Sequence, residues 1–239
     1  MFENLSLLAW GDAGWGDELL RGAALTLTLA VCTLPIGLAI GLGIALAKDS
    51  DSRALKAFGN VYTTVFRSLP ELLTILIIYF GGQILLREIT LALGFEGQIE
   101  INGFIAGLIS LGVVLGAFSS EVWLGALRGI SKGQREAALA LGLTPFKGFR
   151  LVVFPQLVRL ALPGLGNNWM ALLKDTSLVS VIAYSDLLRM TSVAVGVTKQ
   201  PLFFYFVCCM LYLAMAFASS LVIGWLERRG NRGYRRARA

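Results

Sequence analysis

Residues 22–47 of the chain read GAALTLTLAVCTLPIGLAIGLGIALA, and no side chain in this stretch carries a charge. A helix needs about 20 consecutive apolar residues to cross the hydrocarbon core of a bilayer. The stretch is long enough, and we predict that it forms a membrane-spanning helix. The fold of the chain is therefore expected to be set by a bilayer rather than by water.

The composition of the chain supports this assignment. Of its 239 residues, 56% are hydrophobic and 15% are charged, and the mean hydropathy is +0.72. A soluble domain carries about a quarter charged residues. We predict an all-α integral membrane protein built as one domain over residues 1–239. The formal charge of +6 lies in loops and at the C-terminus, which favours contact with lipid head groups over contact with nucleic acid.

Further apolar stretches follow the first along the chain. In all, the sequence predicts five membrane-spanning helices, over about residues 20–47, 61–86, 101–127, 151–173 and 200–226. Only ten residues separate Asp175 from Asp186, too few to cross a bilayer as a helix. We interpret the segment 175–199 as a re-entrant or periplasmic element that lies against the other helices.

Basic residues indicate the orientation of these spans. The segments 48–67, 128–150 and 227–239 hold four, five and six Lys or Arg residues, whereas the other connections and ends hold five in total. Loops on the cytoplasmic side are enriched in these residues. We therefore predict that the N-terminus lies outside and the C-terminus lies in the cytoplasm.

The second predicted cytoplasmic loop carries signals for short helices. Ser131 and Gln134 have the spacing of a capping box, which would start a helix. Gly142 suits the position just past the end of that helix. Thr144 and Pro145 suit the N-cap and first position of a second helix. The sequence therefore predicts a structured loop.

This loop, residues 131–150, is also predicted to contact a soluble partner. Its alanines leave little side-chain bulk, so another protein could approach the backbone closely. The alternative is an amphipathic connector, because every pair of spans needs a linking loop. The residues that we expect to contact the partner are Glu136, Ala137, Ala138 and Gly142.

Ionisable side chains inside predicted spans are costly and mark candidate functional positions. Arg67 and Glu71 are four residues apart and would share one helical face, either as a local ion pair or as contacts for a substrate. Pro70 removes a backbone hydrogen bond and is expected to break the helix beside Leu69. Such breaks expose backbone groups to substrates in many transporters.

Two more polar groups lie in the third and fourth spans. Glu121, beside Ser119, could line a polar cavity or pair with Arg128. Asn167 and Asn168 follow a glycine-rich break, where they could contact a substrate or hydrogen-bond between helices.

Asp175 stands at the end of the fourth span. Its carboxylate could receive a cationic group of a ligand, or it could pair with the adjacent Lys174. The candidate residues of a substrate pathway are Leu69, Glu71, Ser119, Glu121, Asn167, Asp175 and Ser177.

The sequence offers no catalytic constellation. It has no histidine, no G-x-S-x-G, no H-E-x-x-H and no nucleotide-binding P-loop. Its three cysteines lie in apolar runs without metal-ligand spacing, and we expect neither a metal site nor a bound cofactor. An intramembrane enzyme is therefore disfavoured. Without a P-loop, the chain itself is not expected to bind a nucleotide.

The loop carries the pattern E-A-A-x3-G-x9-V-x-F-P, which resembles the coupling loop of importer permeases of the ATP-binding-cassette (ABC) family. The chain resembles the polar amino-acid branch, and most of all the histidine/lysine-arginine-ornithine and octopine/nopaline permeases. The blocks that carry this resemblance are FRSLPELL (66–73), LPGLGNNW (162–169), LKDTSL (173–178) and WLERR (225–229).

The resemblance implies a permease of the type I ABC importer class with five spans in the bacterial inner membrane. It implies pairing with a related permease or a second copy, two ATPase subunits that bind ATP and Mg²⁺, and a periplasmic amino-acid-binding protein. The implied substrate is a polar amino acid or opine, and the carboxylates favour a basic one. A membrane scaffold or channel without ATP coupling is the alternative.

Overall fold

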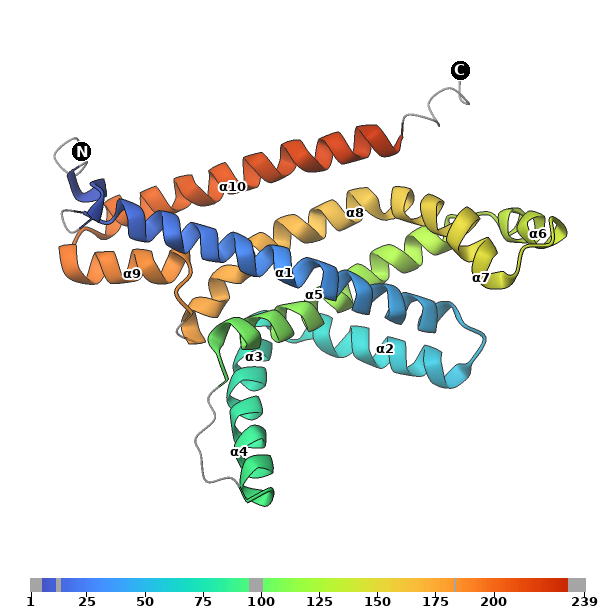
Figure 1. Cartoon of the computed structure of the whole chain (residues 1–239), viewed down its shortest axis with the longest axis horizontal. Helices are drawn as coiled ribbons and strands as arrows, with labels where there is room; N and C mark the ends of the chain where they lie inside the picture. Colours follow the sequence, from blue (N-terminus) through green and yellow to red (C-terminus); the bar gives the residue numbers. More distant parts are fainter. Residues whose placement is uncertain (1–5, 12–13, 95–100, 183, 232–239) are drawn as a thin grey trace.

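The computed structural model describes residues 6–11, 14–94, 101–182 and 184–231, and the regular elements within them are all helical (Figure 1). Two π-helical segments, Ile77–Gly81 and Phe149–Val153, join α3 to α4 and α7 to α8, and a 3₁₀ segment, Thr176–Ile182, follows α8. The α-helices are α1 (Gly16–Asp49), α2 (Arg53–Ser68), α3 (Glu71–Leu76), α4 (Gly82–Ala92), α5 (Gly103–Arg128), α6 (Lys132–Ala140), α7 (Pro145–Gly148), α8 (Phe154–Asp175), α9 (Leu187–Thr198) and α10 (Pro201–Gly230).

Five helical stretches in the described part of the chain are long and apolar enough to cross a membrane. They are Gly16–Asp49, Glu71–Ala92, Gly103–Arg128, Pro145–Ile182 and Pro201–Gly230. The predicted fold class, an all-α membrane protein with five spans, is confirmed. Residues 1–5 and 232–239, and with them most of the Arg-rich tail, lie outside the described residues.

The second span was predicted over residues 61–86, and its start is wrong. The chain leaves the helical conformation at Leu69 (φ −82°, ψ 141°), just before Pro70. A residue that precedes proline disfavours the α conformation, because the ring contacts its backbone. The crossing stretch therefore begins after the break, at Glu71, and α2 is a separate amphipathic helix that packs on α1 and α5.

The segment 175–199 does not form a sixth span. After the 3₁₀ turn, α9 has only 12 residues and packs against α1 and α10. Asp186 begins this helix, since its Oδ1 accepts a hydrogen bond from the Arg189 backbone N–H at 2.9 Å. A short element covered by neighbouring helices is what the sequence predicted for this segment.

The centre of the bundle is the contact between α1 and α5 (Figure 1). Glycines let these helices approach closely. A Cβ atom on Gly37 would lie 2.5 Å from the Leu115 side chain, and one on Gly41 would collide with the Ser119 hydroxyl. Gly37 and Gly41, spaced four residues apart, therefore act in helix packing.

We expect Gly41→Val to destabilise the folded protein by about 1–3 kcal/mol, because the added methyl groups overpack a closed interface. Gly43→Val is the matched control, since a Cβ atom there has nothing within 4 Å. Thermal unfolding of the two detergent-solubilised variants, followed by the loss of the monodisperse peak in size-exclusion chromatography, measures the difference. Equal midpoints would show that the interface tolerates the extra volume.

In the span Glu71–Ala92, α3 packs against α5, whereas α4 leaves the bundle as an arm (Figure 1). Only 11% of the most apolar window of this span is buried, and large side chains such as Phe80, Ile84 and Leu85 are exposed. The corresponding window of α10 is 6% buried. Such apolar surfaces need lipid or another subunit against them.

Candidate functional site

A small hollow lies where α3, α5 and the end of α8 meet, and we call it the acidic hollow. Its volume is about 130 Å³. The break before Pro70 brings Glu71 to this place in the first turn of α3, and α8 ends at Asp175 beside it. The lining residues are Glu71, Leu111, Val114, Leu115, Phe118, Asn168, Ala171, Leu172 and Asp175.

Glu71 and Asp175 place two carboxyl groups within hydrogen-bonding reach of each other. The ion pairs recorded among the described residues include neither group. Neither predicted local pair, Arg67 with Glu71 or Lys174 with Asp175, therefore forms a salt bridge, although Lys174 still attracts Asp175 from a longer distance. Two carboxylates in a partly desolvated site repel each other unless a proton or another cation lies between them. This arrangement therefore favours a proton or another cation between the two carboxyl groups.

Asn168 completes the polar lining. Its Nδ2 atom is buried and has no hydrogen-bond partner among the described residues. The sequence had suggested Asn167 for the pathway, but that side chain is exposed and lies outside the hollow. Helical spacing would have identified the correct residue, because residues 168, 171, 172 and 175 follow the i, i+3, i+4, i+7 pattern of one face.

A second, larger hollow of about 540 Å³ lies further along α5, and we call it the basic hollow. Glu121 is held there by Lys48 from α1, with Nζ 2.6 Å from Oε1, and by Arg67 from α2, with Nη1 3.5 Å from Oε1. The suggested Glu121–Arg128 pair does not form, because Glu121 turns toward α1 and α2 instead. The lining residues are Lys48, Asn60, Thr63, Thr64, Arg67, Ser68, Phe118 and Glu121.

Three other pathway candidates do not line either hollow. Ser119 is fully buried and its hydroxyl donates to the Gly37 carbonyl at 3.1 Å, so it joins α5 to α1. The Ser177 hydroxyl donates to the Lys174 carbonyl at 2.7 Å within its own turn. Leu69 ends α2 at the helix break. These three residues therefore stabilise helix packing, a local turn or a helix end.

The loop predicted to couple to a partner forms α6 and α7 at one end of the molecule (Figure 1). Gly142, at φ +75°, ends α6, with its N–H bonded to the Leu139 carbonyl and the Leu143 N–H bonded to the Ala138 carbonyl. These two bonds form a Schellman motif, as the glycine predicted. Thr144 caps α7, since its hydroxyl accepts from the Lys147 N–H at 3.4 Å.

The predicted capping box is wrong. Ser131 precedes α6 but its side chain makes no capping bond. The Gln134 side chain instead accepts a hydrogen bond from Gln156 Nε2 at 3.2 Å, which ties α6 to α8. A second tie joins α6 to the end of α1, where Arg135 Nη2 lies 3.4 Å from Asp49 Oδ2. The Gln134 side chain therefore bonds to α8 instead of forming the local cap.

The exposed face of this loop differs from the one predicted. Ala138 is 3% exposed and faces Gly148 of α7, so it is closed to a partner. Glu136, Ala137 and Gly142 are exposed. Three large apolar side chains are exposed beside them: Leu139 (55%), Leu141 (81%) and Phe146 (72%). We call these three side chains the apolar tip.

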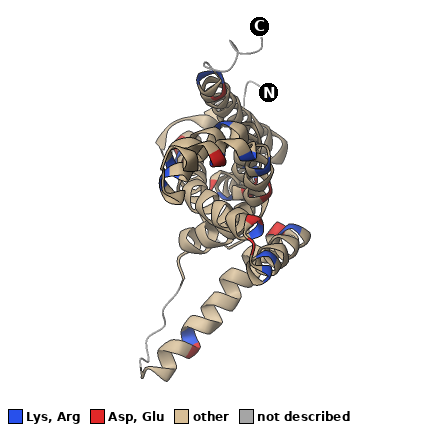
Figure 2. Ribbon diagram, turned by 90° about the vertical axis from the view of Figure 1, so that its right-hand side faces the viewer, with Lys and Arg blue, Asp and Glu red and all other residues tan. Residues whose placement is uncertain are grey.

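Seen from the end that carries α6, Lys and Arg positions lie around the rim of the bundle, and basic positions also occur on the arm (Figure 2). Those at the α6 end belong to the last turns of α1, α5 and α10 and to the short helices between spans. These are the residues from which the cytoplasmic side was predicted, and the orientation of the chain in the membrane stays a prediction.

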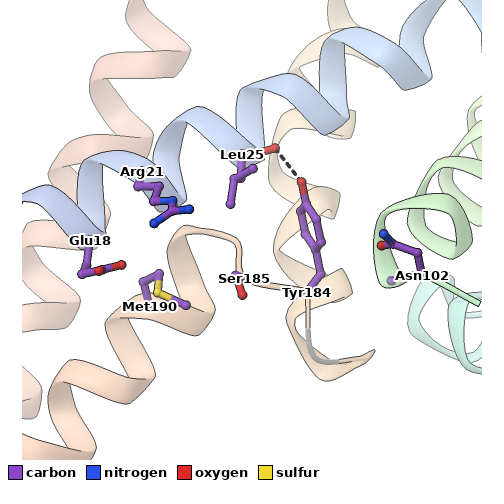
Figure 3. Close-up of a pocket in the computed structure, with 9 residues that line it drawn as sticks. Glu18, Arg21, Leu25, Asn102, Tyr184, Ser185 and Met190 are labelled. Atoms are coloured by element: carbon purple, nitrogen blue, oxygen red, sulfur yellow. Dashed lines mark hydrogen bonds between the residues drawn. The ribbon is translucent and has the colours of Figure 1, made fainter. Parts of the chain in front are cut away.

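The opposite end of α1 carries a third hollow, of about 490 Å³, which we call the outer hollow (Figure 3). Glu18 and Arg21 line it from α1, and Tyr184 lies across it, donating a hydrogen bond to the Leu25 carbonyl at 3.3 Å. Asp186, two residues after Tyr184, is fully buried, and this burial raises the pKa of its carboxyl group to about 6.

Known proteins share this architecture. Residues 37–232 match the family model described as "Binding-protein-dependent transport system inner membrane component". The nopaline transport system permease protein NocQ of Agrobacterium fabrum is 44% identical over 97% of this chain and 99% of its own length. The histidine/lysine/arginine/ornithine transport system permease protein HisQ of Escherichia coli is 40% identical, covering 94% of this chain and 98% of its own.

Solved structures agree with the sequence matches. A chain from a crystal structure of an amino acid ABC transporter with histidines superimposes with a TM-score of 0.74 at 31% identity, over 90% of this chain and 95% of that one. A chain of the MetNI methionine ABC transporter in an inward-facing conformation superimposes with a TM-score of 0.71 at 18% identity, over 90% and 96% of the two chains. The second match supports the fold alone.

Proposed function

The chain belongs to the family of binding-protein-dependent transport system inner membrane components, and on this basis we propose that it conducts basic amino acids or opines across the bacterial inner membrane. The relatives named for nopaline and for histidine, lysine, arginine and ornithine support this class of substrate. These ligands all carry an amino acid group, and most carry a cationic side chain.

The observation that carries the proposal is the acidic hollow. Glu71 and Asp175 lie together there, and neither forms a salt bridge with a basic residue among the described residues. A guanidinium or ammonium group between the two carboxylates would replace their repulsion by attraction. A guanidinium also has several N–H donors, whose hydrogen bonds the carboxylate oxygens can accept.

We further propose that energy reaches this hollow through α6. An ATPase subunit that binds ATP and Mg²⁺ docks on the apolar tip and on Glu136, Ala137 and Gly142. The polar ties from α6 to α8 and to α1 would carry its motion into the bundle. Because α8 also supplies Asn168 and Asp175, movement of α6 and movement of the acidic hollow are mechanically linked.

The remaining parts of the molecule suit the other expected partners. The span Glu71–Ala92, whose α4 forms the arm, exposes apolar surface that a related permease or a second copy of this chain would cover. The outer hollow lies at the end of the bundle opposite α6 (Figure 1). With α6 in the cytoplasm, the outer hollow faces the periplasm, where a binding protein delivers the amino acid.

Uptake by the reconstituted complex tests the proposed substrate class. The complex, purified through a tag on this chain and placed in vesicles with internal ATP, should import arginine, lysine, ornithine or an opine when the binding protein is added. Uptake should stop when ATP is omitted. Import of neutral amino acids alone, or equal fluxes with and without ATP, would contradict the proposal.

A further inference from the structure

The acidic and basic hollows share one wall. Phe118 lines both of them, with Leu111 at the far end of the acidic hollow and Glu121 in the basic hollow. All three residues lie on α5, and the ten residues from Leu111 to Glu121 span about 15 Å at 1.5 Å per residue. Both hollows therefore lie along α5, with a pair of carboxylates in one and two basic side chains in the other.

Arg67 is the basic side chain that has capacity for a ligand. Lys48 is 9% exposed, and its Nζ is committed to Glu121 at 2.6 Å and to Thr63 Oγ1 at 3.2 Å. Arg67 is 46% exposed and reaches Glu121 only at 3.5 Å. Among the described residues, its guanidinium makes no hydrogen bond and otherwise stacks over Phe118, 5.6 Å from the ring centroid.

A free basic amino acid carries three charges in a fixed order. Its side-chain cation is separated by several methylene groups from the α-carbon, which carries a carboxylate and an ammonium group. The two hollows present the complementary order, with Glu71 and Asp175 at one end and Arg67 beside Glu121 at the other. Arginine binds carboxylates through two parallel N–H bonds, which lysine cannot provide.

We propose that the basic hollow receives the α-carboxylate of the transported amino acid, and that Arg67 binds it directly. The side-chain cation of the same molecule then lies in the acidic hollow, and Phe118 lies along the aliphatic part between them. Glu121, 36% exposed, is placed to accept the α-ammonium group. The inference rests on the proposed function, because it assumes that the acidic hollow holds a cation.

Equilibrium binding to the purified permease complex, with ATP and binding protein both absent, tests this assignment. Radiolabelled arginine is compared with agmatine, which is arginine without its carboxylate. Omitting the binding protein removes its own preference for the carboxylate. Arg67→Gln should weaken arginine binding by about tenfold or more and leave agmatine binding unchanged, because only arginine loses a charge-assisted pair. The arginine affinity of Arg67→Lys should lie between that of the wild type and that of Arg67→Gln.

Two further variants separate the possible failures. Arg128→Gln is the matched control. Arg128 is exposed, lies about two helical turns beyond Glu121 on α5, and lines neither hollow. Asp175→Asn should weaken arginine and agmatine alike. If Arg67→Gln weakens both ligands equally, Arg67 has a structural role and the inference is overturned. If Asp175→Asn affects neither ligand, or if wild-type complex binds neither, the acidic hollow is not a cation site and the proposed function fails first.

Discussion

Asp175→Asn is expected to lower ATP-driven uptake of arginine-like substrates by about thirtyfold or more while sparing neutral ones. Removal of one partner from a desolvated charge pair costs about 2–5 kcal/mol, and each 1.4 kcal/mol is a factor of ten. The change should not harm folding, because asparagine has the same shape and ends the repulsion with Glu71. Uptake into vesicles with the binding protein unchanged measures the effect.

A surface carboxylate serves as the control for this variant. Glu88→Gln, on the exposed side of the arm, removes the same charge far from the acidic hollow. Its arginine uptake should match that of the wild type. Glu71→Gln should reproduce the selective loss seen with Asp175→Asn. Equal losses of uptake for cationic and neutral substrates would show that Asp175 has a structural role instead.

Leu141→Glu is expected to abolish stimulation of ATP hydrolysis by loaded binding protein. Leu141 is 81% exposed at the apolar tip, so the substitution leaves the permease core intact. In a docked complex the new carboxylate would be buried against another protein without a partner, which costs several kcal/mol. Co-purification of the ATPase with a tagged permease and its stimulated hydrolysis rate measure docking and coupling separately.

The same substitution at the other end of the molecule controls for charge and for loss of an exposed leucine. Leu202 is 87% exposed at the start of α10, and Leu202→Glu should keep the ATPase bound and stimulated (Figure 1). If the Leu141→Glu complex retains both properties, the assignment of α6 and α7 as the docking site fails.

Local signals predicted much of this fold because they act within a few residues. Apolar length identified the five spans, and Gly142 identified the end of α6, since only glycine enters the left-handed region without strain. Pro70 predicted a broken helix, and the structure places the break at Leu69. The start of the second span was missed because α2 continues its apolar pattern up to the break.

The partners of the polar side chains could not be predicted in the same way. Sequence spacing paired Arg67 with Glu71, but the helix break turns them apart and Arg67 meets Glu121 from α5 instead. Gln134 was assigned to a local cap, whereas α8 supplies a competing partner in Gln156. Ala138 looked accessible until the position of α7 was known. Each of these contacts depends on how distant helices pack.

The most direct test of the central claim is an electron cryo-microscopy structure of the permease complex with bound arginine. The account predicts ligand density between Glu71 and Asp175, with its carboxylate end extending past Phe118 toward Arg67. Density confined to another part of the bundle, or arginine bound with its guanidinium away from both carboxylates, would contradict it.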